Sequence, residues 1–268
     1  LTTKKNDVFD GFLSNKIDLI VGTHSIVKNS SLLKKADLFI VDEEHRFGVK
    51  DKEAVFSLNP VCDFLSLSAT PIPRSLQFSL SGVRNISTML TPPLSRKPIV
   101  LSFLKYNFNF LKTIILREKS RDGQVFVVDN SVNNIKRLFS LFVKSFPHIN
   151  SSLLYGSMDR YKILKTMNDF RNKKIDVLFC TTIIESGIDV PSANSIVVVN
   201  SHLFGLSQLY QLKGRVGRSI FQSFAYFMYP SLKQITGSGL KRLKSLQKND
   251  ELGAGYQIAV SDLNIRGP

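Results

Sequence analysis

The chain has 268 residues, enough for one or two domains, and 43% of them are hydrophobic, which excludes an intrinsically disordered chain. Lysine and arginine outnumber aspartate and glutamate by 36 to 21, and the excess lies in residues 91–268, which hold 25 basic and 11 acidic side chains. Such a basic half indicates a polyanionic partner, most simply nucleic acid, although a generally basic proteome would produce the same balance.

The first ninety residues alternate between helical and strand-like patterns. Apolar residues at helical spacing near the start favour a helix, and short apolar runs followed by turn residues favour strands. The sequence predicts, in order, a helix at 3–14, a strand at 17–21, a buried parallel strand at 38–41, a strand at 63–67 and a helix at 71–81.

Residues 91–98 hold three prolines, which predicts a stiff, extended linker between two domains. Beyond the linker, strands and helices alternate again, which predicts a parallel sheet with right-handed crossovers. The predicted strands are 99–104, 124–128, 153–155, 176–180, 195–199 and 224–229, and the predicted helices are 107–119, 131–146, 159–171 and 206–213. Residues 233–248 carry five basic side chains and no acidic one, and they predict a basic amphipathic helix or simply a solvated surface helix.

Three carboxylates, Asp42, Glu43 and Glu44, follow the apolar run at 38–41, with His45 beside them. In open α/β sheets, ligands bind outside the carboxyl ends of the strands. Mg²⁺ prefers one or two carboxylates together with nucleotide phosphates, and a neighbouring carboxylate can activate a water molecule. The cluster therefore predicts a nucleotide–magnesium site, with an ordinary solvated acidic turn as the alternative.

A second cluster lies in the sequence QLKGRVGR, residues 211–218. Arg215 and Arg218 are three residues apart and flanked by glycines, and we expect them to share one face at the end of a helix. The arginine fork matches phosphate oxygens and stays charged, so the pair suits an arginine finger. A basic helix end is the alternative, because cations stabilise helix C-termini. Upstream, the sequence predicts that Gly187 and Asp189 lie in a turn after a buried strand.

Four segments occur together in an order and spacing that are far more specific than any one of them. They are VDEEHRFGV at 41–49, LSATPIPRSL at 67–76, TTIIESGIDVP at 181–191 and FGLSQLYQLKGRVGRS at 204–219. Together they resemble the motifs of superfamily-2 helicases and translocases. Further matches make the chain most similar to the motor of bacterial transcription-repair coupling factors, the Mfd family, with the RecG family of branch-migration helicases as runner-up. These matches are IDLIVGTH at 17–24, LTPPLSRKPI at 90–99 and LGAGYQIAVSDLNIRG at 252–267.

The resemblance implies an α/β fold with two RecA-like lobes on parallel sheets, the first lobe truncated, followed by the start of a C-terminal helical hairpin. Residues 1–90 would be the C-terminal part of the first lobe, 91–98 the linker, 99–232 the second lobe and 233–268 the start of the hairpin. The implied function is an ATP-dependent motor on duplex DNA that acts in transcription-coupled repair, with ATP and Mg²⁺ as cofactors. RNA polymerase and excision-repair proteins are implied as partners of the intact protein.

The resemblance also assigns roles to individual residues. Asp42 would hold Mg²⁺, Glu43 would activate the attacking water, and Arg215 and Arg218 would reach the γ-phosphate. The other assignments are Gln211, Gly187 and Asp189 at the nucleotide, Ser68 and Thr70 in coupling hydrolysis to DNA contacts, and Thr23, His24, Ser157, Thr181 and Thr182 on DNA phosphates. Tyr155 departs from the pattern, because the family often has histidine there, and this puts the neighbouring backbone contact in doubt.

The phosphate cradle of a nucleotide motor, G-x-x-x-x-G-K-[ST], is absent, because no glycine is followed by another glycine five residues later. We therefore expect the chain to be a piece of a longer protein, and we expect the isolated chain to hydrolyse ATP barely or not at all. A non-catalytic DNA-binding piece is one alternative. An RNA helicase is another, although the segments at 204–212 and 252–255 resemble those of DNA translocases.

Cys62 and Cys180 lie in apolar, strand-like runs and predict buried thiols in a reducing compartment, not a disulfide or a metal site. No apolar run reaches the roughly 18–20 residues that span a bilayer, and no charged-then-apolar leader opens the chain. We expect a cytoplasmic protein with no membrane partner.

Overall fold

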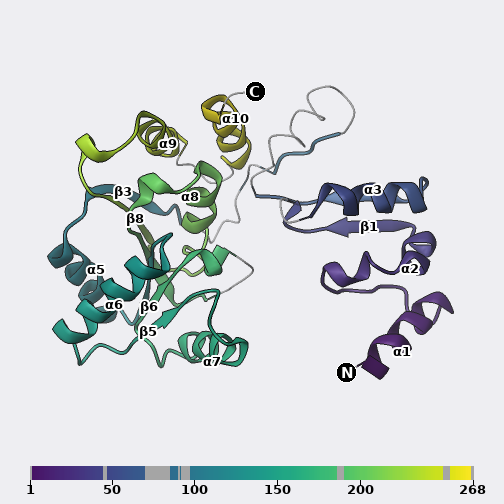
Figure 1. Ribbon diagram of the computed structural model, residues 1–268, viewed down its shortest axis with the longest axis horizontal. Helices are drawn as coiled ribbons and strands as arrows, with labels where there is room; N and C mark the ends of the chain where they lie inside the picture. Colours follow the sequence, from purple (N-terminus) through teal and green to yellow (C-terminus); the bar gives the residue numbers. More distant parts are fainter. Residues whose placement is uncertain are drawn as a thin grey trace. The chain divides into compact units, whose positions relative to one another are not determined.

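The computed structural model describes residues 2–44, 47–69, 85–89, 91, 97–185, 190–249 and 254–266. The chain divides into two compact units, Leu1–Ile72 and Pro73–Pro268, the first in purple to blue and the second mainly in teal to yellow in Figure 1. Each unit has its own hydrophobic core.

The first unit is a small sheet with helices packed on it. Its elements are α1 (Thr2–Leu13), η1 (His24–Ile26), α2 (Ser30–Lys35), β1 (Leu38–Val41), α3 (Val49–Leu58) and β2 (Asp63–Ser66). β1 and β2 pair in parallel. The core is small: Val27, Leu33 and Val55 are buried together, and the rings of Phe39 and Phe64 pack against them.

Two strand predictions in the first unit differ from the structure. Residues 17–21 form no strand, and Leu19 and Val21 are 73% and 86% exposed. A strand needs a neighbour to satisfy its backbone groups, and no described residue pairs with this segment. β1 is parallel as predicted but only partly buried, because Leu38 and Ile40 are exposed on a described sheet of two strands whereas Val41 is buried. The predicted helix at 71–81 lies outside the described residues.

The second unit is built, among its described residues, on an all-parallel sheet of six strands in the order β3-β8-β7-β4-β6-β5. Its strands are β3 (Val100–Lys105), β4 (Gln124–Val128), β5 (Ser151–Leu154), β6 (Val177–Cys180), β7 (Ala193–Val198) and β8 (Phe224–Tyr229). Its helices are α5 (Phe108–Ser120), α6 (Val132–Ser145), α7 (Arg160–Arg171), α8 (Leu206–Lys213), α9 (Gly237–Lys248) and α10 (Gly255–Arg266), with short 3-10 helices η3 (Thr182–Glu185), η4 (Ser201–Leu203) and η5 (Leu232–Gln234). The predicted parallel sheet is confirmed, and its strands lie within two residues of the predicted ranges.

Helices cover both faces of this sheet (Figure 1). Successive residues of a strand face opposite layers. Along β4, Val125 and Val127 pack with residues of α5 and α6, whereas Phe126 and Val128 pack with residues of α7 to α10. Burial on both faces explains why the strands are continuously apolar rather than alternating.

α9 and α10 form the helical pair that follows the sheet. α9 begins at Gly237, where the Thr236 hydroxyl accepts a hydrogen bond from the backbone N–H of Gly239 at 3.2 Å. Leu243 and Leu246 are buried, so the predicted amphipathic helix is present, although it starts later than residue 233. α10, which the sequence predicted only as part of a hairpin, packs against α8 and α9. In the described part of the chain, every helix is too short or too polar to cross a membrane.

Candidate nucleotide and nucleic-acid sites

The acidic turn follows β1 and is joined by its backbone to the segment that follows β2. The backbone N–H of Leu67 donates to Val41 O at 2.8 Å, and the backbone N–H of Glu44 donates to Leu67 O at 3.1 Å. Asp42 and Glu43 therefore lie at the carboxyl end of a parallel strand, as the sequence predicted, and Ser68 follows the strand that pairs with it. His45 and Thr70 lie outside the described residues.

The conformation of this turn leaves the Asp42 carboxylate exposed to solvent. Glu43 has φ +54°, in the left-handed region, and its backbone N–H donates to Asp42 Oδ1 at 2.8 Å. In the described part of the chain, no group of three His, Cys, Asp or Glu side chains is arranged to hold a metal ion. An exposed carboxylate fits Mg²⁺ when phosphate and water oxygens supply the other ligands, which is how Mg²⁺ is usually held beside nucleotides.

His24 and Thr23 lie in the same unit, His24 as the first residue of η1 and Thr23 directly before it. The His24 ring stacks on Phe47 with centroids 4.9 Å apart, and its Nε2 lies 2.9 Å from Asp51 Oδ2. These two partners fix the imidazole, whereas the Thr23 hydroxyl is exposed and lies 3.3 Å from Ser25 Oγ. Their assignment to DNA phosphates stays a prediction.

The arginines of the second unit follow α8 rather than lying on it. α8 ends at Lys213 as predicted, and Gly214 caps it. The expectation that Arg215 and Arg218 share a helix face is therefore wrong. Beyond the helix, Gly217 adopts φ +78°, a conformation that side chains with a Cβ disfavour.

The two arginines have different surroundings. Arg215 is 7% exposed, and Gln211, in the last turn of α8, is also buried. Arg218 is exposed, and its Nε donates to Gly214 O at 3.4 Å. Gly187 and Asp189, predicted to line the nucleotide, lie outside the described residues.

Ser157 and Thr181 come together at the carboxyl edge of the second sheet. β5 and β6 are neighbours, and the backbone N–H of Thr181 donates to Leu154 O at 3.2 Å. Ser157 is exposed, whereas Thr181 is buried and Thr182 half-buried. Of the three residues of this unit that were predicted to contact DNA phosphates, Ser157 is therefore the most accessible to a ligand.

The first turns of α7 contain a basic surface that the sequence analysis did not single out. Tyr161 is 73% exposed, and Arg160, Lys162, Leu164 and Lys165 are also exposed. Among the described residues, no ion pair involves the three cations of this surface. The sequence could have indicated this surface through the run RYKILK at 160–165, which follows the Gly-Ser-Met turn at 156–158 and Asp159.

Three other lysines of the second unit pair with carboxylates. Lys119 Nζ lies 2.6 Å from Asp176 Oδ2, Lys174 Nζ lies 3.3 Å from Asp169 Oδ1, and Lys173 Nζ pairs with Asp122 Oδ2. In contrast to these lysines, the cations Arg160, Lys162 and Lys165 at the start of α7 form no ion pair with any described residue. The position of these cations next to Ser157 extends the candidate nucleic-acid surface.

Two buried polar groups lie at the ends of β4 and β7. Asp129 accepts hydrogen bonds at 2.8 Å from the backbone N–H of Ser131 and from Asn200 Nδ2; burial raises its pKa, while these bonds oppose the rise. His202 is buried beside Arg242, whose guanidinium donates to His202 O at 2.9 Å. Burial, together with the Arg242 charge, lowers the pKa of His202.

Comparison with known proteins gives a consistent result. The family model of the helicase conserved C-terminal domain matches residues 106–219. A transcription-repair-coupling factor of Staphylococcus epidermidis (strain ATCC 35984) is 44% identical over 258 residues, and one of Staphylococcus aureus (strain USA300) is 43% identical over the same length; each match covers 96% of this chain. The solved structure of RecG bound to a three-way DNA junction has a TM-score of 0.73 and 29% identity over the whole chain, covering 35% of the RecG chain.

The chain spans 22% of the length of these two curated relatives. Its parallel sheet, its ordered motifs and these matches agree, and the chain belongs to the superfamily-2 helicases.

Proposed function

We propose that the chain is part of an ATP-dependent motor that moves along duplex DNA in transcription-coupled repair. The observation that carries this proposal is the 44% identity, over 96% of the chain, to a protein named transcription-repair-coupling factor. In the intact protein, RNA polymerase and excision-repair proteins are the proposed partners.

In the first unit, Asp42 is the proposed magnesium ligand and Glu43 the residue that orients and deprotonates water. ATP with Mg²⁺ would supply the phosphoryl group whose hydrolysis drives the motor. The exposed Asp42 carboxylate and the left-handed turn at Glu43 support these roles, because they present both carboxylates at the end of the strand. Ser68, joined to this turn through Leu67, is the proposed coupling residue together with Thr70.

In the second unit, Arg215 and Arg218 are proposed to stabilise negative charge on the γ-phosphate, and Gln211, Gly187 and Asp189 to contact the nucleotide. A guanidinium that is mostly buried keeps its charge and is less screened by water than an exposed one. The low exposure of Arg215 therefore supports Arg215 as the stronger contributor of the two arginines.

The proposed DNA contacts of the second unit are the exposed Ser157, with Thr181 and Thr182 behind it, and the cations Arg160 and Lys165. Phosphate contacts release counterions, so DNA binding should weaken steeply with salt and ignore base sequence. In the first unit, Thr23 and His24 are the proposed contacts.

The first test is ATP hydrolysis by the intact protein, with and without duplex DNA. Arg215→Ala should lower DNA-stimulated kcat by roughly a thousandfold, the scale of an arginine finger. Arg171→Ala removes an exposed arginine from the end of α7 and is the matched control. Normal turnover in Arg215→Ala would contradict the proposed role.

A companion test uses the 268-residue chain without the upstream part of the protein. We propose that it hydrolyses ATP at background level, because it lacks the phosphate cradle. Turnover that Glu43→Gln abolishes would show that other residues hold the phosphates.

A DNA-binding titration tests the α7 surface. Replacing Arg160 and Lys165 together by alanine should reduce the slope of log affinity against log salt by about 1–2. Replacing the paired Lys173 and Lys174 by alanine removes the same charge and should change the slope less. Equal effects would remove the case for α7, and a preference for RNA over duplex DNA as competitor would favour an RNA helicase.

A RecG-like branch-migration helicase is the second candidate, supported by the whole-chain similarity to RecG bound to a three-way DNA junction. The two candidates differ in substrate. Displacement of a stalled RNA polymerase by the intact protein would support the first, and unwinding of a three-way junction without an effect on polymerase would support the second.

A further inference from the structure

Glu118 is a buried carboxylate in an unfavourable place. It lies in the last turn of α5 and is 0% exposed. The negative end of the helix dipole opposes a carboxylate there, and burial removes it from water. A side chain held at this position therefore depends on strong local partners.

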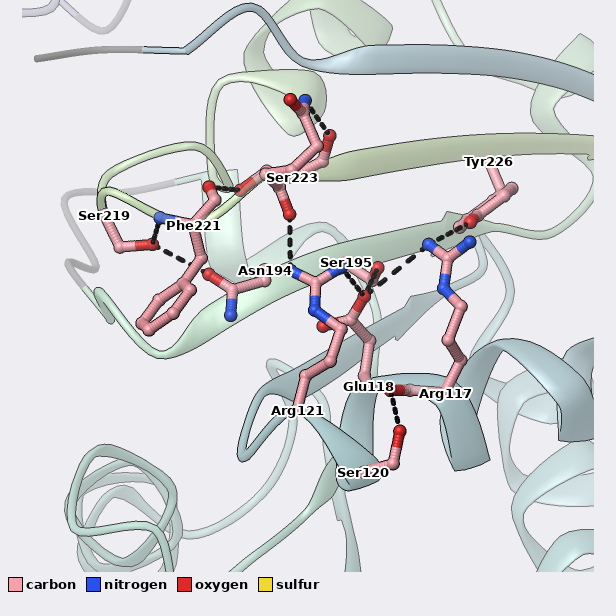
Figure 2. Close-up of polar contacts among 11 residues, drawn as sticks. Arg117, Glu118, Ser120, Arg121, Asn194, Ser195, Ser219, Phe221, Ser223 and Tyr226 are labelled. Carbon is pink, nitrogen blue, oxygen red and sulfur yellow. Dashed lines mark hydrogen bonds and ion pairs between the residues drawn. The ribbon is translucent and has the colours of Figure 1, made fainter.

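Figure 2 shows those partners. Ser195 Oγ, from β7, donates to Glu118 Oε1 at 2.8 Å, and the guanidinium groups of Arg117 and Arg121 lie 3.7 and 3.5 Å from the same oxygen. The Arg117 guanidinium also donates to the Tyr226 hydroxyl at 2.8 Å, which ties α5 to β8. Glu118 Oε2 is buried and has no hydrogen-bond partner among the described residues.

Gly123 closes the space around this carboxylate. A Cβ added to Gly123 would lie 2.6 Å from Glu118 Oε2 and 2.9 Å from Asn194 Nδ2. Both side chains are buried, so neither can move aside easily. Glycine is required here by space, because the Glu118 carboxylate and the Asn194 amide both lie against it. Asn194 is also the residue before Ser195, which donates to Glu118.

The same network reaches the segment that directly follows the arginines. Ser219 Oγ donates to Asn194 Oδ1 at 2.9 Å, and Arg121 donates to Gln222 O at 2.7 Å. Ser219 is the residue after Arg218. The buried carboxylate and its neighbours thus hold the chain immediately beyond Arg218.

The end of the proline-rich linker is attached to this segment as well. Gln222 Nε2 donates to Pro98 O at 2.6 Å. A Cβ on Gly217 would lie 2.8 Å from Ile99 Cγ1, so Gly217 and Ile99 are already in close contact. The stretch from Gly214 to Ser223 is consequently fixed by α8 on one side and by the network and Ile99 on the other.

We propose that Glu118, Asn194 and Ser219 are positioning residues that hold Arg215 and Arg218 in the geometry required at the ATP phosphates. The inference rests on the proposed function of the two arginines. Removing the Ser219 hydroxyl loosens the chain beyond Arg218 without touching the nucleotide. Because a displacement of about 1 Å can cost roughly a hundredfold in rate, a loosened arginine should lower kcat and leave the KM for ATP nearly unchanged.

The test is DNA-stimulated ATP hydrolysis by the intact protein. Ser219→Ala should lower kcat about tenfold with little change in KM or melting temperature, and Ser219→Thr, which keeps the hydroxyl, should restore it. Ser120→Ala is the matched control, because its hydroxyl donates to Arg117 O on the exposed side of α5 and does not contact the arginine segment. Glu118→Gln, which removes the charge but keeps an acceptor for Ser195, should also lower kcat.

A double variant separates positioning from a purely structural role. If Ser219 acts through Arg218, the loss caused by Ser219→Ala should disappear when Arg218 is already alanine. The same loss in both backgrounds, or unchanged kcat in Ser219→Ala, would overturn the inference. Unchanged kcat in Arg218→Ala and in Arg215→Ala would instead overturn the proposed function of the arginines.

Discussion

The two units differ in how completely each buries its sheet. In the second unit, helices cover both faces of six parallel strands, and two core clusters extend along them. In the first unit, the described sheet has two strands and one small cluster around Leu33. The first unit therefore has fewer apolar contacts to stabilise its sheet.

Two similar apolar runs show what this difference means. Residues 38–41 read LFIV and residues 125–128 read VFVV. Every residue of the second run is buried, whereas Leu38 and Ile40 in the first are more than half exposed. Both runs form parallel strands, so local sequence sets the strand, but burial depends on which elements cover it.

Both units nevertheless place polar candidates at the carboxyl ends of strands, at Asp42 in the first and Ser157 in the second. This edge is where open α/β sheets bind ligands, because loops and helix starts gather there. The comparison leads to four predictions about stability, given from the largest expected effect to the smallest.

Replacing a central aromatic ring of the second unit by alanine should lower the free energy of unfolding more than any of the other substitutions. Phe126 is buried, with its ring 4.9 Å from that of Phe170, so Phe126→Ala should lower the free energy of unfolding by about 3–5 kcal/mol. Tyrosine fluorescence measures this unit alone, because all seven tyrosines lie between residues 106 and 256 and the chain has no tryptophan.

Phe56→Ala, at a partly exposed ring of the first unit, is the control for that measurement. It should leave the tyrosine transition in place, since the reporters lie in the other unit. Equal shifts for the two variants would show that the units unfold together and would contradict the comparison.

The two cysteines measure the opening of each unit separately, with Cys62 in the first and Cys180 in β6 of the second. Both are buried, and burial raises the pKa of both thiols. In the 268-residue chain, Cys62 should react with iodoacetamide about 100-fold faster, because local opening of a small core costs less than opening of the central sheet. Peptide mass spectrometry measures both rates. In denaturant the rates should converge, and equal rates under native conditions would contradict the prediction.

Removing a helix cap should lower the free energy of unfolding by less, and only in the unit that contains the helix. Ser131 Oγ accepts from the Asn134 N–H at 3.3 Å at the start of α6, and Ser131→Ala should cost about 1 kcal/mol in the tyrosine transition. Asn29→Ala removes the cap of α2 in the first unit and should not change that transition. Ser131→Asp keeps an acceptor and should retain most of the stability; a full loss in Ser131→Asp would rule out capping as the cause.

The smallest expected effect is on how the free energy of unfolding of the second unit changes with pH. Since the folded pKa of His202 is below its ordinary value of 6.5, the unfolded chain binds more protons as pH falls through 6.5, and stability should decrease. His202→Gln should reduce this decrease in tyrosine-monitored unfolding. The pKa of Asp129 is raised from 3.8, so protonation of Asp129 at lower pH favours the folded state instead. Asp129 is present in both proteins, so the difference between His202→Gln and its parent reports the contribution of His202. Identical pH profiles would contradict the prediction.

Most of the second unit could be predicted from sequence because its signals are local. β4, α8 and β8 have the predicted bounds, since apolar runs and turn residues define them. The candidate site was predicted less completely. The segment that carries the arginines leaves α8 at Gly214 and packs, at Gly217, against Ile99, which lies far from it in the chain.

The sequence by itself determined the order of strands and helices in the second unit, the basic half and the family motifs, because each depends on composition or on neighbours within a few residues. Tertiary structure alone decided which strands are buried and which of the described cations form ion pairs. It also created the network of Glu118, Asn194 and Ser219, whose members come from α5, β7 and the segment after α8. Contacts between residues so far apart exist only when the sheet brings its elements together, and no local pattern encodes them.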